Sequence, residues 1–311
     1  MRLGFGCVNL GSASGGASRR DQVRLVAEAL DRGVTVFDTA DVYGSGASER
    51  VVGEGLGGRR AEAVIATKAG YVFREKSSVE QTARRTAKTV LDRVRPRGGQ
   101  SHRGGSGAYA AQDFSAGHLR AAVDGSLRRL RTDYLDVLQL HGPHEVQPEL
   151  LTQLHDLVRA GKVRRFGIGA ESVAQAASWL PVEGVDVVQV PFGVLDPEAR
   201  DDVLPIAEQY SVEVWARGVL GGGVLKAAAA GDAGVREDPN WPVIERVTRM
   251  SQRTGIDVMA LAVGFVRAYA GVSTVLTGIS TRDHLLRNLD LMAAPPLDDE
   301  LLAEFREVPN D

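Results

Sequence analysis

The sequence contains little cysteine and none of the spacings that mark a metal site. Cys7 is the only cysteine among 311 residues, so no disulfide can form within the chain, and a reducing cytoplasm is the expected compartment. HExxH and CxxC spacings are both absent, which argues against metal-assisted chemistry. No apolar run reaches the length of a membrane span, and the first residues lack the apolar segment of a signal peptide. We therefore expect a soluble cytoplasmic protein with no resident metal.

The chain also lacks an excess of either charge. It has 37 basic and 40 acidic residues, a formal net charge of −3 and a pI near 6.1, so we expect no nucleic-acid or membrane partner. At this length, with 43% apolar and 25% charged residues, the composition suits one large α/β barrel or two ordinary domains. These observations leave homo-oligomerisation open.

The segment VTVFDTADVY, residues 34–43, places polar groups directly after a buried strand. Its β-branched and aromatic residues predict a short strand that is covered on both faces. Asp38, Asp41 and Tyr43 follow at or just beyond the carboxyl end of that strand. The carboxyl ends of parallel strands are where α/β barrels and sheets hold their chemical groups.

Two further predicted strands end in side chains that can do chemistry. AVIATK, residues 63–68, ends in Lys68, although only five of the 37 basic residues are lysine. YLDVLQLH, residues 134–141, ends in His141. Each of these residues alone has a structural explanation, such as a turn or a surface strand end. Their joint occurrence at consecutive strand ends favours a shared site.

Short apolar runs alternate with helical patterns along the whole chain. The predicted strands are residues 3–7, 34–37, 63–68, 134–140, 165–169, 185–190, 212–216 and 272–276. The predicted helices are residues 19–32, 47–56, 118–131, 150–160, 173–180, 197–209, 243–254, 257–269 and 282–292. Eight strands separated by helices predict a (β/α)8 TIM barrel as a single domain over residues 1–311. An open doubly wound sheet is the alternative, but the first strand is not followed by a GxGxxG phosphate loop.

Five segments together resemble the aldo-keto reductase superfamily. They are FDTADVYGSGASERVVGEGL, ATK, LRAAVDGSLRRLRTDYLDVLQLHGP, GKVRRFGIG and TGISTRDHLLRN, in the order of that family and across nearly the whole chain. The resemblance implies a barrel enzyme that uses a nicotinamide cofactor to reduce an aldehyde or ketone. The expected substrate is a small polar carbonyl compound, such as a keto sugar or a natural-product intermediate.

The resemblance implies four catalytic residues: Tyr43, Lys68, Asp38 and His141. A phenol titrates near about 10, so we expect the Lys68 ammonium to make Tyr43 acidic enough to donate a proton. Asp38 would hold the ammonium in place and keep it charged. His141 would donate a hydrogen bond to the carbonyl oxygen of the substrate.

The resemblance also places the nicotinamide. Gln189 matches the glutamine that contacts the carboxamide, whereas Ala170 and Glu171 replace the usual Ser-Asn pair. Arg217 stands where the family has an aromatic residue stacked on the nicotinamide, and its guanidinium could either stack or reach a phosphate. We expect Trp215 to point to the other side of this strand. The expected cofactor side consists of Arg217, Gly218 and Leu220.

The adenosine end of the cofactor is expected on the segment that follows the last strand. The resemblance assigns to it Gly278, Ser280, Arg282, His284, Arg287 and Asn288. Thr281 is predicted to cap the helix, so that the backbone N–H groups after it can bind an anion. Arg282 and Arg287 add positive charge there, which favours binding of the 2′-phosphate of NADP(H) over NAD. The alternative is that these arginines only make the start of the helix basic and solvated and bind no cofactor.

Residues 74–112 form a basic insertion between the third strand and the next helix. It has seven arginines and two lysines against Glu75, Glu80 and Asp92. Residues 79–94 have weak helical character, and residues 98–107 are expected to be mobile. One hypothesis is that the insertion lines the pocket and attracts an anionic or polar substrate. A disordered loop or a subunit contact is the alternative.

Two other functions remain open at this stage. The protein could run in the oxidising direction, as an aldose or alcohol dehydrogenase, because direction depends on the cellular cofactor ratio. It could also be a regulatory subunit that senses a dinucleotide with little turnover. Retention of all four catalytic residues argues against the second function.

Overall fold

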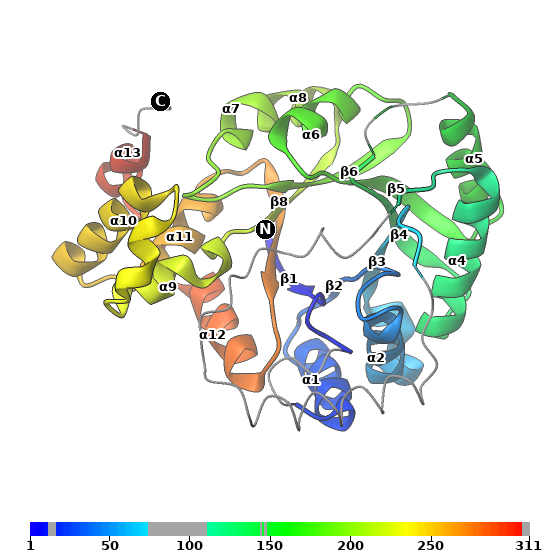
Figure 1. Cartoon of the computed structure of the whole chain (residues 1–311), viewed down its shortest axis with the longest axis horizontal. Coiled ribbons are helices and arrows are strands. Elements are labelled where there is room, and N and C mark those ends of the chain that lie inside the picture. Colours follow the sequence, from blue (N-terminus) through cyan, green and yellow to red (C-terminus); the bar gives the residue numbers. More distant parts are fainter. Residues whose placement is uncertain (12–16, 74–110, 144, 146–147, 307–311) are drawn as a thin grey trace.

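The structure is a computed structural model that describes residues 1–11, 17–73, 111–143, 145 and 148–306. Its eight strands are parallel and close into a barrel in chain order (Figure 1). They are β1 (Arg2–Gly6), β2 (Val36–Asp38), β3 (Val64–Ala69), β4 (Leu135–His141), β5 (Val163–Gly169), β6 (Val185–Pro191), β7 (Glu213–Arg217) and β8 (Val272–Gly278). The (β/α)8 barrel predicted from the sequence is therefore confirmed.

Helices surround this barrel (Figure 1). The α-helices are α1 (Arg19–Asp31), α2 (Ala47–Leu56), α4 (Ala116–Leu130), α5 (Pro148–Arg159), α6 (Val173–Trp179), α7 (Ala199–Asp202), α8 (Leu204–Tyr210), α9 (Val224–Ala229), α10 (Trp241–Thr254), α11 (Val258–Arg267), α12 (Arg282–Ala293) and α13 (Asp299–Arg306). The short 3₁₀ helices in the described part of the chain are η1 (Gly57–Glu62), η3 (Gly221–Gly223) and η4 (Ala233–Glu237).

Polar side chains begin several of these helices. Ser18 accepts a hydrogen bond from the Asp21 backbone, and the Asp21 side chain accepts one from the Ser18 backbone, which makes a complete capping box at α1. Ser115 caps α4, so that helix begins two residues before its predicted start. Such caps satisfy backbone N–H groups that have no partner within the helix.

The clearest differences from the prediction are one divided helix, one strand that begins later and two additional helices. The helix predicted over residues 197–209 is two helices, because Val203 has φ −117° between α7 and α8 and Pro205 lies in the first turn of α8. Proline has no N–H to continue the preceding helix. Strand β2 begins at Val36 rather than residue 34. Helices α9 and α13 were not predicted.

The apolar core has two parts that lie on the two faces of the strands. The larger part lies between the strands and the helices. The smaller part fills the barrel interior. It consists of one residue from each of six strands: Val36, Ala66, Val137, Val187, Trp215 and Leu276. Residues two positions further along each strand therefore face the barrel axis one layer higher.

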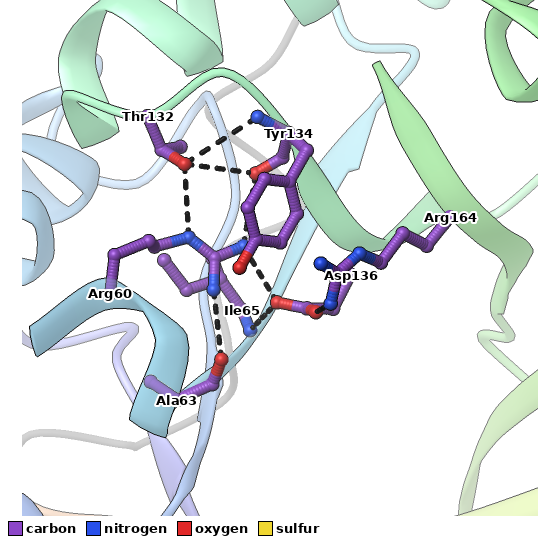
Figure 2. Close-up of polar contacts among 7 residues, drawn as sticks. All are labelled: Arg60, Ala63, Ile65, Thr132, Tyr134, Asp136 and Arg164. Atoms are coloured by element: carbon purple, nitrogen blue, oxygen red, sulfur yellow. Dashed lines mark hydrogen bonds and ion pairs between the residues drawn. The ribbon is translucent and has the colours of Figure 1, made fainter. Parts of the chain in front are cut away.

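An ionic cluster lies at the amino end of the strands (Figure 2). Asp136, near the start of β4, accepts hydrogen bonds from Arg60 at 2.6 Å, Arg164 at 3.0 Å and the Ile65 backbone at 2.9 Å. Both guanidinium groups lie over the ring of Tyr134, 4.1 and 3.8 Å from its centroid. This cluster ties the start of β4 to β3, β5 and η1.

Candidate active site

The layer above the interior core brings together side chains from adjacent strands. Asp38 ends β2, Lys68 lies near the end of β3, and Gln139 and His141 lie in β4. Each is an even number of residues from a member of the interior core, so their side chains enter the barrel at its carboxyl end. Three of the four residues that the sequence analysis assigned to catalysis thus come from neighbouring strands.

Lys68 and Asp38 form a buried ion pair in this layer. The Lys68 ammonium lies 2.6 and 2.7 Å from the two Asp38 oxygens and 3.2 Å from the Thr39 carbonyl oxygen. Lys68 is 2% exposed and Asp38 is 6% exposed. Burial lowers the pKa of Lys68, but Asp38 and Tyr43 outweigh it, so the net pKa is raised. Lys68 therefore stays charged although it is buried.

The Lys68 side chain has room because β5 carries a glycine beside it. A methyl group on Gly169 would lie 3.2 Å from Lys68 Cε and 3.3 Å from Gln139 Oε1. Gln139 Nε2 in turn donates to Asp38 Oδ1 at 3.3 Å. A larger residue at position 169 would press on the chain that carries the ammonium.

Tyr43 reaches the site through a tight turn rather than a strand. Gly44, Ser45 and Gly46 all have positive φ angles, 60°, 56° and 84°, which two glycines allow without steric cost. The Tyr43 backbone donates to the Ala40 carbonyl oxygen at 3.1 Å and accepts from the Ser48 backbone at 3.2 Å. These bonds fix the phenol beside Lys68, whose ammonium lies 5.3 Å from the ring centroid.

The pKa of Tyr43 is raised, which corrects the expectation of an acidified phenol. Burial raises it most; the charge of Lys68 lowers it, and the charge of Asp38 raises it again. Because Asp38 neutralises much of the ammonium, Lys68 does not compensate for burial. The phenol is therefore protonated at neutral pH, with a cation beside it.

His141 packs against two aromatic rings. Its ring centroid lies 6.2 Å from that of Tyr43 and 4.8 Å from that of Tyr71, edge to face in both cases. Burial lowers the pKa of His141 to about 3, with further contributions from the charges of Lys68 and Arg217. His141 is therefore neutral at physiological pH. Its Nδ1 atom is buried and has no hydrogen-bond partner among the described residues.

Four further residues lie in this region. Tyr71 and Gln139 were not anticipated from the sequence, whereas Glu171 was expected beside the nicotinamide and Gln112 is the last residue of the basic insertion. Tyr71 donates to Glu171 Oε1 at 2.9 Å, and Gln112 Nε2 donates to the His141 carbonyl oxygen at 2.9 Å. Gln139 could have been found, because it lies two residues before His141 and so shares its face of the strand. The other three lie in loops or after strand ends, where no periodicity reveals the direction of a side chain.

Gln189 presents an unused amide near the end of β6. It is 3% exposed, and its Nε2 atom has no hydrogen-bond partner in the part of the chain that the structure describes. A buried amide N–H without a partner costs free energy unless a ligand accepts its hydrogen bond. The carboxamide oxygen of a nicotinamide fits this requirement.

Arg217 ends β7 on the same face as Trp215, which corrects the expectation for Trp215. Residues two apart on a strand point the same way, and Trp215 is buried in the interior core one layer below. Its Nε1 donates to Glu213 at 3.0 Å. The guanidinium of Arg217 donates to the Ala170 carbonyl oxygen at 2.8 Å. Beyond it, Gly218 is exposed with φ +76°, and Leu220 is partly buried.

The residues expected at the adenosine end lie at the end of β8 and along the first half of α12, and all but the buried Asn288 are exposed or partly exposed. Thr281 caps this helix as predicted, accepting from the His284 backbone at 3.1 Å. Ser280 Oγ and His284 Nδ1 are 3.0 Å apart. Gly278 ends β8 beside them. The first turn of α12 therefore offers N–H groups and polar side chains to an anion.

Three other residues predicted for this end already have protein partners. Arg282 donates to Glu28 on α1 at 2.9 Å, and Arg287 donates to Asp257 at 2.9 Å. Asn288 is buried and donates to Thr277 Oγ1 at 2.9 Å, an interaction that ties α12 to β8.

The basic insertion lies almost wholly outside the described residues, whereas the expectations on metals and membrane spans can be compared with the described part of the chain. The basic insertion lies outside the described residues except for Ala111 and Gln112, so its predicted helix and its contact with the pocket stay predictions. Among the described residues, no group of three or more His, Cys, Asp or Glu side chains could hold a metal ion. No described helix is both long and apolar enough to cross a membrane.

The fold and the site together define an aldo-keto reductase. The sequence profile of the Aldo/keto reductase family matches residues 2–310, and the chain belongs to this family. The resemblance inferred from the sequence is therefore confirmed, and with it the assignment to a family of oxidoreductases.

Individual relatives agree with this assignment. Aldo-keto reductase YhdN of Bacillus subtilis is 27% identical over 301 residues, which cover 89% of this chain and 80% of that protein. The holo form of an aldo-keto reductase from Bacillus halodurans has a TM-score of 0.76 at 26% identity and covers 98% of this chain and 91% of its own. An aldo/keto reductase from Klebsiella pneumoniae in complex with NADP and acetate shares the fold, with a TM-score of 0.67 at 23% identity, covering 97% and 89% of the two chains.

Proposed function

We propose that this protein transfers a hydride from NADPH to the carbonyl carbon of a small polar aldehyde or ketone, with Tyr43 as the proton donor. The observation that carries the proposal is the juxtaposition of Tyr43, the Lys68–Asp38 ion pair and His141 at the carboxyl end of the barrel. These are the groups that carbonyl reduction requires at one oxygen atom.

Each of the four residues has a distinct task in this proposal. The protonated phenol of Tyr43 donates its proton to the carbonyl oxygen as negative charge develops there. The Lys68 ammonium then stabilises the phenolate that remains, and Asp38 holds that ammonium in position. His141, neutral because its pKa is lowered to about 3, offers one ring N–H to the same oxygen without competing as an acid.

The chain also offers groups that would hold the cofactor. Gln189 would bind the nicotinamide carboxamide through its unused Nε2, and the first turn of α12 would bind the phosphate on the adenosine ribose. Ser280, Arg282 and His284 lie at that turn. When bound, NADPH supplies the hydride.

A screen of aldehydes, ketones and keto sugars, followed by loss of NADPH absorbance, tests the proposal. The Tyr43→Phe variant should lose turnover by about 10²- to 10⁴-fold, the usual contribution of a general acid, while its melting temperature stays near that of the wild type. Turnover retained by this variant would contradict the assigned role. We expect a higher kcat/KM with NADPH than with NADH, and the opposite preference would contradict the choice of cofactor.

The same assay separates the alternatives. Measurable turnover excludes a purely regulatory subunit. Rates measured with NADP and alcohols or sugars give the preference for the oxidising direction.

A further inference from the structure

No hydrogen bond fixes the imidazole of His141 through its Nδ1 atom. That atom is buried and has no hydrogen-bond partner among the described residues, whereas a functional histidine is often oriented by a bond at this nitrogen. The structure instead shows two aromatic neighbours of the ring, Tyr43 and Tyr71. The orientation of His141 therefore depends on what holds these neighbours in place.

Tyr71 is the nearer of the two aromatic neighbours. Its ring centroid lies 4.8 Å from that of His141, with 84° between the ring planes, against 6.2 Å for Tyr43. The Tyr71 side chain is buried, and its hydroxyl donates to Glu171 Oε1 at 2.9 Å. Burial and this bond raise the pKa of Tyr71 to about 12, so the hydroxyl stays protonated and remains a donor.

The side chain of Glu171 crosses the end of β4 to reach Tyr71. A methyl group on Gly142, directly after β4, would lie 2.8 Å from Glu171 Oε1 and 2.9 Å from its Cδ and Cγ atoms. Strand β4 separates β5 from β3, whereas Gln189 lies on β6, on the other side of β5. The carboxylate is therefore directed toward Tyr71 and not toward Gln189. The Glu171 backbone N–H is held as well, by Gln175 Oε1 at 2.7 Å.

The main chain beside the imidazole is held from the same side. Gln112 Nε2 donates to the carbonyl oxygens of His141 and Gly142, at 2.9 and 3.1 Å. Gln112 also pairs with Tyr71 across an isolated β-bridge. The backbone of His141 and the ring that packs on its imidazole thus belong to one hydrogen-bonded unit.

We propose that Tyr71 is a positioning residue: its ring, anchored through its hydroxyl to the Glu171 carboxylate, holds the His141 imidazole at the angle from which it donates to the substrate carbonyl oxygen. This inference rests on the proposed reductase function. In it, Glu171 serves His141, and the nicotinamide carboxamide is left to Gln189. A catalytic group that is slightly misplaced loses much of its effect on the rate.

Variants of the two anchored residues test the proposal. Tyr71→Phe keeps the ring and removes the hydroxyl, so it should lower kcat by about two- to tenfold, the scale of one hydrogen bond, with KM nearly unchanged. Glu171→Ala should have the same effect, whereas Glu171→Gln keeps an acceptor oxygen and should retain most of the rate. The double variant Tyr71→Phe/Glu171→Ala should be no slower than either single variant, because both remove the same bond.

A matched control and a binding measurement accompany these rates. Tyr210→Phe alters an exposed tyrosine at the end of α8 and should leave kcat unchanged. The Kd for NADPH, measured by fluorescence, should be the same for the wild type, Tyr71→Phe and Glu171→Ala. A weaker Kd in Glu171→Ala, with an unchanged kcat in Tyr71→Phe, would overturn the proposal and assign Glu171 to the cofactor. Losses that multiply in the double variant would also overturn it.

NMR of the cofactor-free protein separates this inference from the proposed function. The imidazole signal of His141, identified by its loss in His141→Gln, should stay constant from pH 8 to pH 5 in the wild type, because its pKa is about 3. Tyr71→Leu removes the covering ring, so the pKa should rise toward the ordinary value of about 6.5 and the signal should shift over this range. Identical behaviour of the two proteins would overturn the positioning role, whether or not the protein turns over a carbonyl compound.

Discussion

The Lys68 ammonium contacts both carboxylate oxygens of Asp38, at 2.6 and 2.7 Å, in a region almost closed to solvent. The pair joins the neighbouring strands β2 and β3 on the inside of the barrel. Its members depend on each other, because removing one leaves the other buried and charged.

This dependence predicts a stability loss that a second mutation repairs. Lys68→Met should lower the free energy of unfolding by about 3–5 kcal/mol, the usual cost of breaking a buried ion pair. The double variant Lys68→Met/Asp38→Asn should recover most of that stability, since no buried charge remains, but should stay inactive. Urea unfolding and NADPH-dependent turnover measure the two effects. A double variant as unstable as the single one would show that the pair is not the cause.

The lowered pKa of His141 predicts a pH dependence of stability. Its native pKa is about 3, whereas an unfolded histidine titrates near about 6.5. Between these values the unfolded state binds more protons, so the contribution of His141 to stability is present above pH 6.5 and is lost as the pH falls toward 3. The slope is at most about 1.4 kcal/mol per pH unit.

Urea unfolding at pH 7 and pH 5 checks this expectation. The wild type should lose more free energy of unfolding between the two pH values than His141→Gln, which cannot take up the proton. Equal losses would mean that the native imidazole titrates normally.

The cluster around Asp136 should stabilise the protein without affecting turnover. Asp136→Asn breaks an ion pair with Arg60 that is largely shielded from water and a second one with Arg164, whose side chain is 59% exposed (Figure 2). We expect a loss of about 3 kcal/mol in the free energy of unfolding, most of it from the Arg60 pair. Because the cluster lies at the amino end of the strands, kcat/KM should stay within about twofold of the wild type. Asp156→Asn, which removes an exposed partner of Arg120 and Arg159, is the matched control and should leave the melting temperature unchanged.

Glu28 should oppose binding of NADPH. It accepts a hydrogen bond from Arg282 at 2.9 Å and also pairs with Arg32, so a 2′-phosphate would have to compete with it for Arg282. Glu28→Gln should lower KM for NADPH by about two- to fivefold, the scale of an exposed ion pair, and should leave KM for NADH unchanged. Glu54→Gln, on the neighbouring helix α2, is the control. An equal change for both dinucleotides would place Arg282 away from the 2′-phosphate.

The parts of the site that follow from strand periodicity could be predicted from the sequence. Asp38, Lys68 and His141 end apolar runs, and parallel strands in register bring such ends to one rim. The break between α7 and α8 could not be predicted from apolar spacing, because the pattern continues through it. Pro205 is visible in the sequence, but the backbone at Val203, which separates the two helices, is seen only in the folded chain.

The remaining features depend on contacts between residues distant in the chain. Gln112 reaches His141 because it pairs with Tyr71 across a β-bridge, which no local pattern indicates. The raised pKa of Tyr43 results from burial and from the opposing effects of Asp38, which raises it, and of Lys68 and Arg217, which lower it. Its direction therefore depends on the positions of all these groups. Arg217 was assigned to the cofactor side by resemblance alone, and its lack of a described carboxylate partner emerged only from the structure.

The seam between β1 and β8 has a consequence for synthesis of the protein. Five residue pairs, from Arg2↔Thr274 to Gly6↔Gly278, join the first strand to the last. On the ribosome, β1 is made before the other seven strands of the barrel, yet one of its edges has no neighbour until β8, which begins at Val272, has been made. An unpaired strand edge is a template for association with other chains, so the nascent protein is exposed to aggregation until its final strand arrives.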